Sequence, residues 1–174
     1  MKKPPLILTN ALVFIISGAI AFIGVPLWVA YQGIDWAEIG TAIFLFYFTG
    51  MSITAGYHRL WSHKTYDANI VVRIILAIGG AMALQNSILH WSSDHRVHHR
   101  HVDDNDKDPY SAKKGLWFAH IGWMLREYQA KRYDDYSNCK DLQKDSVVMW
   151  QHKYYLPIVP VSYTHLRAHE TKAN

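Results

Sequence analysis

The chain has 174 residues, half of them hydrophobic, with a formal net charge of +4 and a single cysteine, Cys139. This length suggests one domain. The small, scattered positive charge argues against a nucleic-acid-binding protein, and one cysteine excludes an intrachain disulfide framework and a cysteine zinc cluster. The eleven histidines are the unusual feature of the composition.

Two long apolar segments lie near the N-terminus, at about 10–31 and 37–56. Each is long enough to cross a hydrocarbon core of about 30 Å, which takes about 20 helical residues. The first is too long for the apolar core of a cleaved signal peptide, about 7–15 residues. The loop between them has no Lys or Arg, and the basic residues lie outside the pair, at Lys2, Lys3, Arg59 and Lys64. The positive-inside rule therefore predicts a multi-pass integral membrane protein with both outer ends on the cytoplasmic side.

A third hydrophobic helix is expected at about 69–90. Arg73, Gln85 and Asn86 make it more polar than the first two segments, so it could either span the membrane or lie at or under the interface. We favour the interfacial position, because histidine-rich segments flank it on both sides and should share a compartment. Residues 115–133 are typical of an interfacial amphipathic helix with Trp117 and Trp123, ending in a basic cluster. The sequence thus predicts an all-α membrane protein.

The stretch HWSSDHRVHHRHVDD (90–104) carries five histidines. On a helix at roughly 100° per residue, His95, His98 and His99 fall within an arc of about 100°, whereas His90 and His101 fall outside it. Three neutral imidazoles that face one point are typical ligands of a transition metal. A solvated histidine run is the alternative for this string alone.

His58 and His63 follow the second apolar segment on the same predicted side of the membrane. Five residues correspond to about 140° on an ideal α-helix, so the pair can share a metal only if the helix ends or distorts between them. Alone they could be two interfacial histidines beside Trp61. Two histidine clusters on one side of paired membrane helices favour a metal site.

The acidic run DDNDKDPYSAKKG is a rival metal site. It has Asp104, Asp106 and Asp108 in alternation, but Pro109 and Gly115 occupy positions where a calcium loop needs Gly and Glu. We interpret the run as a polar turn, in which Asp103 or Asp106 could accept hydrogen bonds from ligand imidazoles.

The motifs HRLWSH (58–63) and DHRVHH (94–99) resemble the first and second histidine boxes, HxxxxH and HxxHH, of the membrane fatty acid desaturases, most closely the Δ9 acyl-CoA (stearoyl-CoA type) branch. ALQN before the second box, with DPY and HIGWML after it, extends the resemblance over about residues 10–156. It implies a di-iron enzyme that uses O₂ to place a cis double bond in a saturated acyl chain, on acyl-CoA or another acyl carrier. An external electron donor, such as cytochrome b5, a ferredoxin or a reductase, would supply electrons, and membrane lipid would surround the helices.

The resemblance also implies roles for single residues. Gln85 and Trp91 match residues that shape the bend of the acyl channel, and Asn86 and Asp94 match residues that touch the CoA head group. Ser93 stands where CoA enzymes often have Arg, which leaves the head group open, and Gln85 and Asn86 could instead cap the preceding helix. His120 would have a supporting role. The iron ligands implied are His58, His63, His95, His98 and His99.

The family pattern includes a third box, HxxHH in a GxGxHNxHH context, which this sequence does not contain. We expect residues 1–160 to be the N-terminal part of a desaturase domain, inactive as this chain alone. The segment 161–174 resembles a translated sequencing adapter, so we do not interpret His165 and His169 as a zinc pair. Two alternatives remain open, namely a membrane lipid hydroxylase with the same boxes and a non-enzymatic membrane protein that carries metal ions or binds haem.

Overall fold

The computed structural model describes residues 4–128 and 134–160. This part of the chain is helical, with no β-strand and only an isolated bridge between Leu6 and Arg126, so the predicted all-α fold is confirmed. The expected tail at 161–174 and the basic end of the expected 115–133 helix lie outside the described residues.

The first long helix is a continuous rod of 25 residues, built from α1 (Leu8–Ala19), a π-helical turn η1 (Ile20–Gly24) and α2 (Val25–Gln32). It ends at Gly33, whose φ of 83° is a left-handed conformation that glycine adopts without steric cost. None of the residues in its most apolar window is buried within the protein. A rod this apolar and this exposed suits a lipid environment and not the core of a soluble protein.

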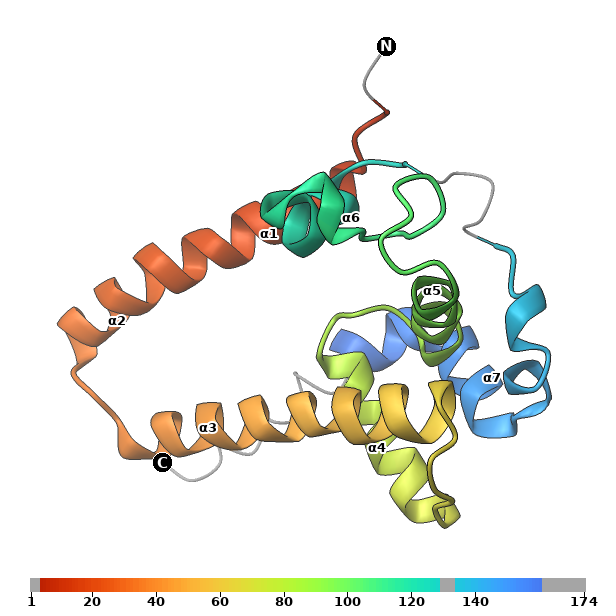
Figure 1. Ribbon diagram of the computed structural model, residues 1–174. Helices are drawn as coiled ribbons and strands as arrows, with labels where there is room; N and C mark the ends of the chain where they lie inside the picture. Colours follow the sequence, from red (N-terminus) through yellow and green to blue (C-terminus); the bar gives the residue numbers. More distant parts are fainter. Residues whose placement is uncertain (1–3, 129–133, 161–174) are drawn as a thin grey trace.

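The second long helix begins after Asp35, whose carboxylate accepts a hydrogen bond from the backbone N–H of Ala37. It consists of α3 (Trp36–Met51), which continues without a break into the π-helix η2 (Ser52–Ser62), 27 residues in all. Figure 1 shows the two long helices as the arms of an open hairpin, joined by the short segment 33–35. Both are long and apolar enough to cross a membrane. The helix extends past the expected end at about 56 and includes His58.

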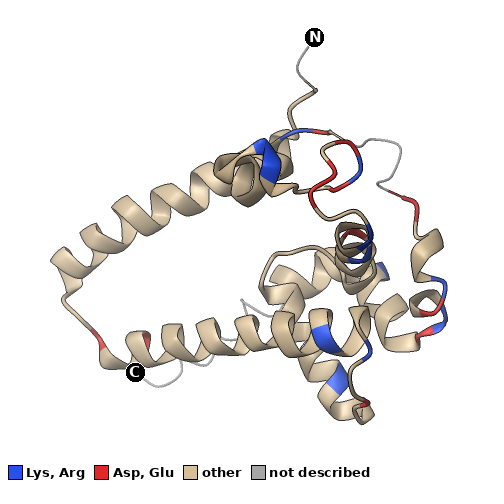
Figure 2. Ribbon diagram, in the orientation of Figure 1, with Lys and Arg blue, Asp and Glu red and all other residues tan. Residues whose placement is uncertain are grey.

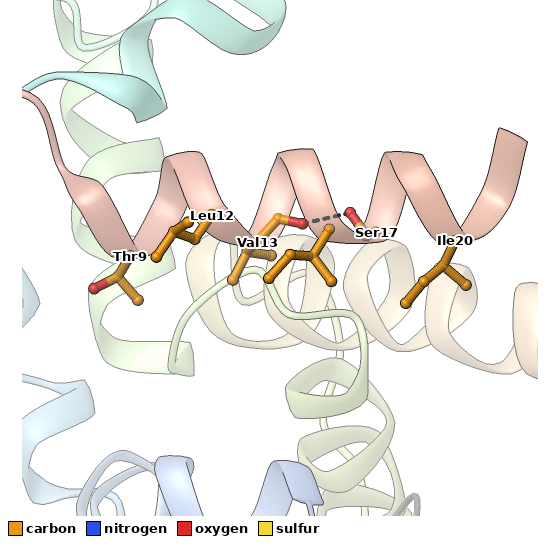
Figure 3. A pocket seen from close by; sticks show the side chains of 6 residues that line it. Thr9, Leu12, Val13, Ser17 and Ile20 are labelled. Atoms are coloured by element: carbon orange, nitrogen blue, oxygen red, sulfur yellow. Dashed lines mark hydrogen bonds between the residues drawn. The ribbon is translucent and has the colours of Figure 1, made fainter. Parts of the chain in front are cut away.

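One face of α1 carries an apolar groove, and the hydroxyl group of Ser17 in this groove is hydrogen-bonded within the helix. A groove along it is lined only by side chains of α1 and its continuation (Figure 3), from Thr9, Leu12, Val13, Ile16, Ser17 and Ile20. The hydroxyl of Ser17 donates to the carbonyl of Val13 at 2.6 Å. The polar group is therefore satisfied inside the helix, as a hydrocarbon environment requires.

The helix expected at about 69–90 is instead two helices, α4 (Ile70–Met82) and α5 (Ile88–Arg100). The chain turns between them because Leu84 and Asn86 adopt positive φ angles, and Ser87 then caps α5 by accepting from the backbone N–H of His90. At 13 residues, or about 20 Å, α4 is too short to span a membrane. Its position at the membrane interface stays a prediction.

The helix expected at 115–133 ends early. It comprises η4 (Phe118–Gly122) and α6 (Trp123–Leu125), and Arg126 is already extended. Arg126 forms the bridge with Leu6 and donates to the carbonyl of Pro4, so pairing with the N-terminal segment replaces the next helical turn. The remaining elements are η3 (Ala112–Lys114), η6 (Ser137–Cys139), η7 (Leu142–Lys144) and α7 (Ser146–Lys153).

The core forms where η2, α4, α5 and α7 meet, around Tyr57, Trp61, Ile88, Leu89 and Val148, which are almost fully buried. Gly79 and Gly80 let α4 approach η2 closely, since a Cβ at Gly80 would lie 2.2 Å from Cε1 of Tyr57. Figure 2 shows that charged residues gather at this end of the molecule, while the arms of the hairpin are nearly free of charge.

Candidate metal centre

The first two histidines come from the π-helix η2. The backbone N–H of His63 donates to the carbonyl of His58 at 3.0 Å, the i to i+5 pattern of a π-helix. Residues five apart therefore lie about one turn from each other, and the two imidazole rings have centroids 4.6 Å apart. The distortion that this spacing needs for a shared metal is thus present, while Tyr57 and Trp61 stay in the core.

The second pair comes from α5. His95 and His99 lie one α-helical turn apart, and their Nε2 atoms are separated by 3.1 Å. The Nε2 of His95 also lies 3.0 Å from the Nε2 of His63. His58, His63, His95 and His99 each offer one nitrogen, and these four nitrogens lie within 4.8 Å of one another. We call this set the histidine cluster.

The histidine cluster fits a bound transition metal. Ligands at about 2.1 Å from one ion, at tetrahedral or octahedral angles, stand about 3.0–3.4 Å apart, and two of the observed nitrogen separations fall in this range. Four imidazoles offer nitrogen donors without charge, which suits zinc, copper, iron or nickel and not calcium or magnesium. The donor set excludes a thiolate site, because Cys139 is buried in the core away from these rings.

The surroundings of His95 and His63 favour the neutral form of these two imidazoles. Burial, together with the neighbouring rings of His99, His58, His63 and His98, lowers the pKa of His95 to about 3. Partial burial, the imidazoles of His58 and His99 and the guanidinium of Arg96 lower the pKa of His63. A neutral imidazole has a free nitrogen lone pair, so both shifts favour the form that binds a metal.

His98 departs from the expected triad. Its ring lies near the histidine cluster, with a centroid 5.6 Å from that of His99, but its Nδ1 donates to the carboxylate of Asp108 at 2.9 Å. It is not one of the four nitrogens that converge. The helical wheel places His98 and His99 on the same broad face and does not resolve which of them turns toward His63.

Asp108 is the carboxylate partner, in place of the expected Asp103 or Asp106. Its side chain is fully buried and also accepts from the backbone N–H groups of Asp103 and Tyr110. Burial acts to raise the pKa of Asp108, but the hydrogen bonds from His98 and the backbone hold it below its ordinary value. An ionised carboxylate on Nδ1 fixes the tautomer of His98 and leaves its Nε2 free. Asp104 caps the turn through the N–H groups of Asp106 and Lys107, so the acidic run is the expected polar turn.

Two of the expected substrate residues lie beside the histidine cluster. The ring of Trp91 stacks on His95 with centroids 4.7 Å apart and meets His58 edge-on. Its indole N–H donates to the side-chain carbonyl of Gln85 at 3.2 Å. The side-chain carbonyl of Gln85 thus reaches forward to the tryptophan that adjoins the imidazoles.

The other two expected substrate residues, Asp94 and Asn86, contact groups that do not belong to the histidine cluster. The carboxylate of Asp94 pairs with His90 at 3.5 Å. Asn86 holds the turn before α5 through its backbone, whose carbonyl accepts from Tyr57 and whose N–H donates to Tyr155. His90 also contacts the hydroxyl of Tyr136.

The other histidines of the boxes and motifs lie outside the histidine cluster, among the residues that the structure describes. His101 caps the C-terminus of α5, and His120 is exposed, with its Nδ1 donating to the carbonyl of Leu116. The supporting role expected of His120 stays a prediction.

Two neighbours of the histidine cluster were not expected from the sequence. Tyr110, in the DPY motif, packs its ring against His98 at a tilt of 35° and places its hydroxyl 3.5 Å from Nδ1 of His95. Arg96 lies within the second box and pairs with Asp141, 45 residues later. The DPY motif draws attention to Tyr110 in the sequence. No local pattern indicates that Asp141 is the partner of Arg96.

Comparison with known proteins gives a consistent result. The family model described as "Fatty acid desaturase" matches residues 34–166. The chain is 50% identical over 117 residues to a probable acyl-CoA desaturase of Schizosaccharomyces pombe, covering 67% of this chain and 24% of that protein. It is 38% identical over 157 residues to an acyl-CoA Delta-9 desaturase of Acheta domesticus, covering 87% and 42%. A stearoyl-CoA desaturase of Bos taurus is 44% identical over 117 residues, covering 65% and 32%. The chain thus spans between about a quarter and two fifths of the length of these relatives.

Proposed function

Because the chain belongs to the fatty acid desaturase family, we propose that it is the part of an acyl desaturase that carries the first and second histidine boxes. The whole enzyme would place a cis double bond, at Δ9, in a saturated acyl chain during unsaturated fatty acid synthesis. The names of its relatives, acyl-CoA and stearoyl-CoA desaturases, support this activity and an acyl-CoA substrate.

The observation that carries the proposal is the convergence of four histidines from two separate boxes on one point. We propose two iron ions as the cofactor, held by His58, His63, His95 and His99 together with His98. The Nε2 of His98, opposite the Nδ1 bound to Asp108, would serve the second ion. Bound iron would supply O₂ activation and the removal of two hydrogens from a methylene pair, with O₂ reduced to two waters by two electrons from the substrate and two from the external donor, together with two protons.

The chain's own residues would bind and orient the acyl chain. Trp91 forms a flat apolar wall against His95 and His58, and Gln85 fixes that indole by accepting its N–H. A methylene pair lying on this wall would be adjacent to the metal ligands, which is the placement that the reaction needs. Asn86 and Asp94 are the proposed contacts of the CoA head group, as the resemblance of ALQN and of the second box to the family motifs implies.

We propose that the histidine cluster faces the cytoplasm. Lys2 and Lys3 precede the first long helix, Arg59 lies in the last part of the second and Lys64 follows it, while the connecting turn carries no Lys or Arg. A cytoplasmic position would expose the site to acyl-CoA and to a cytochrome b5, ferredoxin or reductase as electron donor. The membrane lipid would contact the two rods along their exposed apolar faces.

A chimeric enzyme tests the proposed function. Residues 34–160 of this chain replace the matching segment of the Schizosaccharomyces pombe relative, and the chimera is expressed in a yeast that depends on added unsaturated fatty acid. We expect growth without the supplement and Δ9 monounsaturated products by gas chromatography and mass spectrometry. The same chimera with His95→Ala should give neither.

The product of the chimera distinguishes a desaturase from a hydroxylase. A hydroxylated acyl chain would favour a hydroxylase, while a chimera that is inserted in the membrane at normal levels and gives no oxidised product would contradict both. The unmodified relative and the His95→Ala chimera serve as positive and negative controls in the same strain.

A further inference from the structure

Arg96 stands between two of the box histidines and uses every hydrogen-bond donor it has. A guanidinium group carries five N–H donors in a fixed plane. All five are engaged: Nε donates to the carbonyl of Ser62, one terminal nitrogen to the carbonyl of Asn138 and to Asp141, and the other to the carbonyl of Trp61 and to Asp141. The distances lie between 2.8 and 3.2 Å.

Two of these acceptors belong to the last turn of η2. The last carbonyls of a helix have no partner within the helix, and the carbonyls of Trp61 and Ser62 precede His63 directly. Arg96, on α5 next to His95, supplies their partner. One side chain therefore joins the end of the first box to the start of the second, at the point where Nε2 of His63 and Nε2 of His95 lie 3.0 Å apart.

The other acceptors hold the guanidinium in place from outside the boxes. Asp141 binds it through both carboxylate oxygens, at 2.8 and 2.9 Å, and also pairs with Lys64, next to His63. Such a two-oxygen pair fixes orientation as well as position. The turn at 137–144 thus orients Arg96 toward the carbonyls of Trp61 and Ser62 in η2. A buried hydrogen bond from the hydroxyl of Ser62 to that of Ser92 also joins η2 and α5.

We propose that Arg96, oriented by Asp141, is a positioning residue that sets the approach of His63 to His95 and so the geometry of the metal centre. The proposal rests on the proposed function, because it assumes that the histidine cluster binds a metal. Lysine cannot replace arginine here, because three donors on a flexible stem cannot satisfy five acceptor contacts in one plane.

The test measures Co²⁺ binding to the 174-residue chain in detergent micelles, followed by the visible d–d absorption of the bound ion. We expect Arg96→Lys to lower the affinity by about 10–100-fold, the usual cost of losing a residue that orients a metal ligand, and to alter the d–d spectrum. Asp141→Asn, which leaves the guanidinium in place but loosens it, should give a smaller loss in the same direction. Arg100→Lys is the matched control, since Arg100 is exposed on the same helix, and should bind as the wild type does.

A purely structural role gives a different result. If Arg96→Lys lowers the thermal midpoint but binds Co²⁺ with wild-type affinity and spectrum while folded, the proposal is overturned. Should Arg96→Lys fail to fold, Asp141→Asn decides, and wild-type affinity in that variant also overturns it. Absence of Co²⁺ binding by the wild-type chain would remove the metal centre of the proposed function, and the positioning role with it.

Discussion

The backbone N–H of His63 donates to the carbonyl of His58 at 3.0 Å. This one hydrogen bond puts the first histidine box in π-helical register and brings two residues, five apart in sequence, to the same side of η2. In α-helical register the position that follows His58 by one turn would be Ser62. The register of η2 therefore decides which side chain reaches the metal centre.

Moving the histidine by one position tests this register. We expect His63→Ala to reduce Co²⁺ affinity, and Ser62→His in the same chain to leave it reduced, because position 62 points into the core toward Ser92. Ser62→Ala alone controls for the lost hydrogen bond. Recovery of wild-type affinity by Ser62→His with His63→Ala would mean that the helix is α-helical here.

The carboxylate of Asp108 should matter to metal binding and its neighbours in the acidic run should not. Asp108→Asn removes the ionised acceptor that fixes the tautomer of His98, so we expect metal affinity to fall by about 10–100-fold. Asp106→Asn, an exposed residue of the same turn, is the control and should leave the affinity unchanged. Equal losses in the two variants would assign the effect to the charge of the turn and not to the contact with His98. Isothermal titration with Zn²⁺ measures both.

Because α4 packs closely on η2, alanine substitutions at Gly80 and Gly40 should differ in their effect on the free energy of unfolding. Gly80→Ala would place a methyl group 2.2 Å from the ring of Tyr57, and we expect a loss of about 1–3 kcal/mol in the free energy of unfolding from overpacking. Gly40→Ala, in α3, meets nothing within 4 Å and should be neutral or stabilising by up to about 1 kcal/mol. Thermal unfolding in micelles, followed by circular dichroism, compares the two. Equal midpoints would show that α4 does not pack on Tyr57 this tightly.

The lowered pKa values of His95 and His63 predict how the metal-free chain responds to acid. In the unfolded chain these imidazoles take up a proton near pH 6.5, whereas in the folded chain His95 resists protonation down to about pH 3. The unfolded state thus binds more protons in this window, so stability falls as the pH drops from about 6.5 toward 3. His95→Asn should flatten this dependence, and a slope unchanged by that substitution would contradict the pKa assignment.

Much of the fold could be predicted from the sequence, because hydrophobic runs of membrane length and histidine spacing are local signals. The two rods, the helix that carries the second box and the separation of His90 and His101 from the histidine cluster followed from these signals. The break at 83–87 did not, since the apolar pattern of 70–89 continues across it and the left-handed conformations of Leu84 and Asn86 depend on tertiary contacts. One such contact is the hydrogen bond from Tyr57 to the carbonyl of Asn86.

The candidate site shows the same division between local and distant signals. Spacing indicated which histidines belong to the boxes, but the angle on an ideal helix put His58 and His63 far apart, and only the π-helix brings them together. The choice between His98 and His99, and between Asp106 and Asp108, depends on how the turn at 101–110 folds back on α5. The pairing of Arg96 with Asp141 joins residues 45 positions apart, and no periodicity can indicate it.

X-ray absorption of the chain loaded with one equivalent of Zn²⁺, a redox-inert probe, tests the central claim most directly. If the two histidine boxes form one metal centre, the first shell contains only light donors at about 2.0–2.1 Å, with the outer-shell scattering of several imidazoles. Replacement of His58 and His95 by alanine should then reduce the imidazole contribution and the affinity together. A first shell without imidazole scattering, or one that survives this double substitution unchanged, would contradict the account.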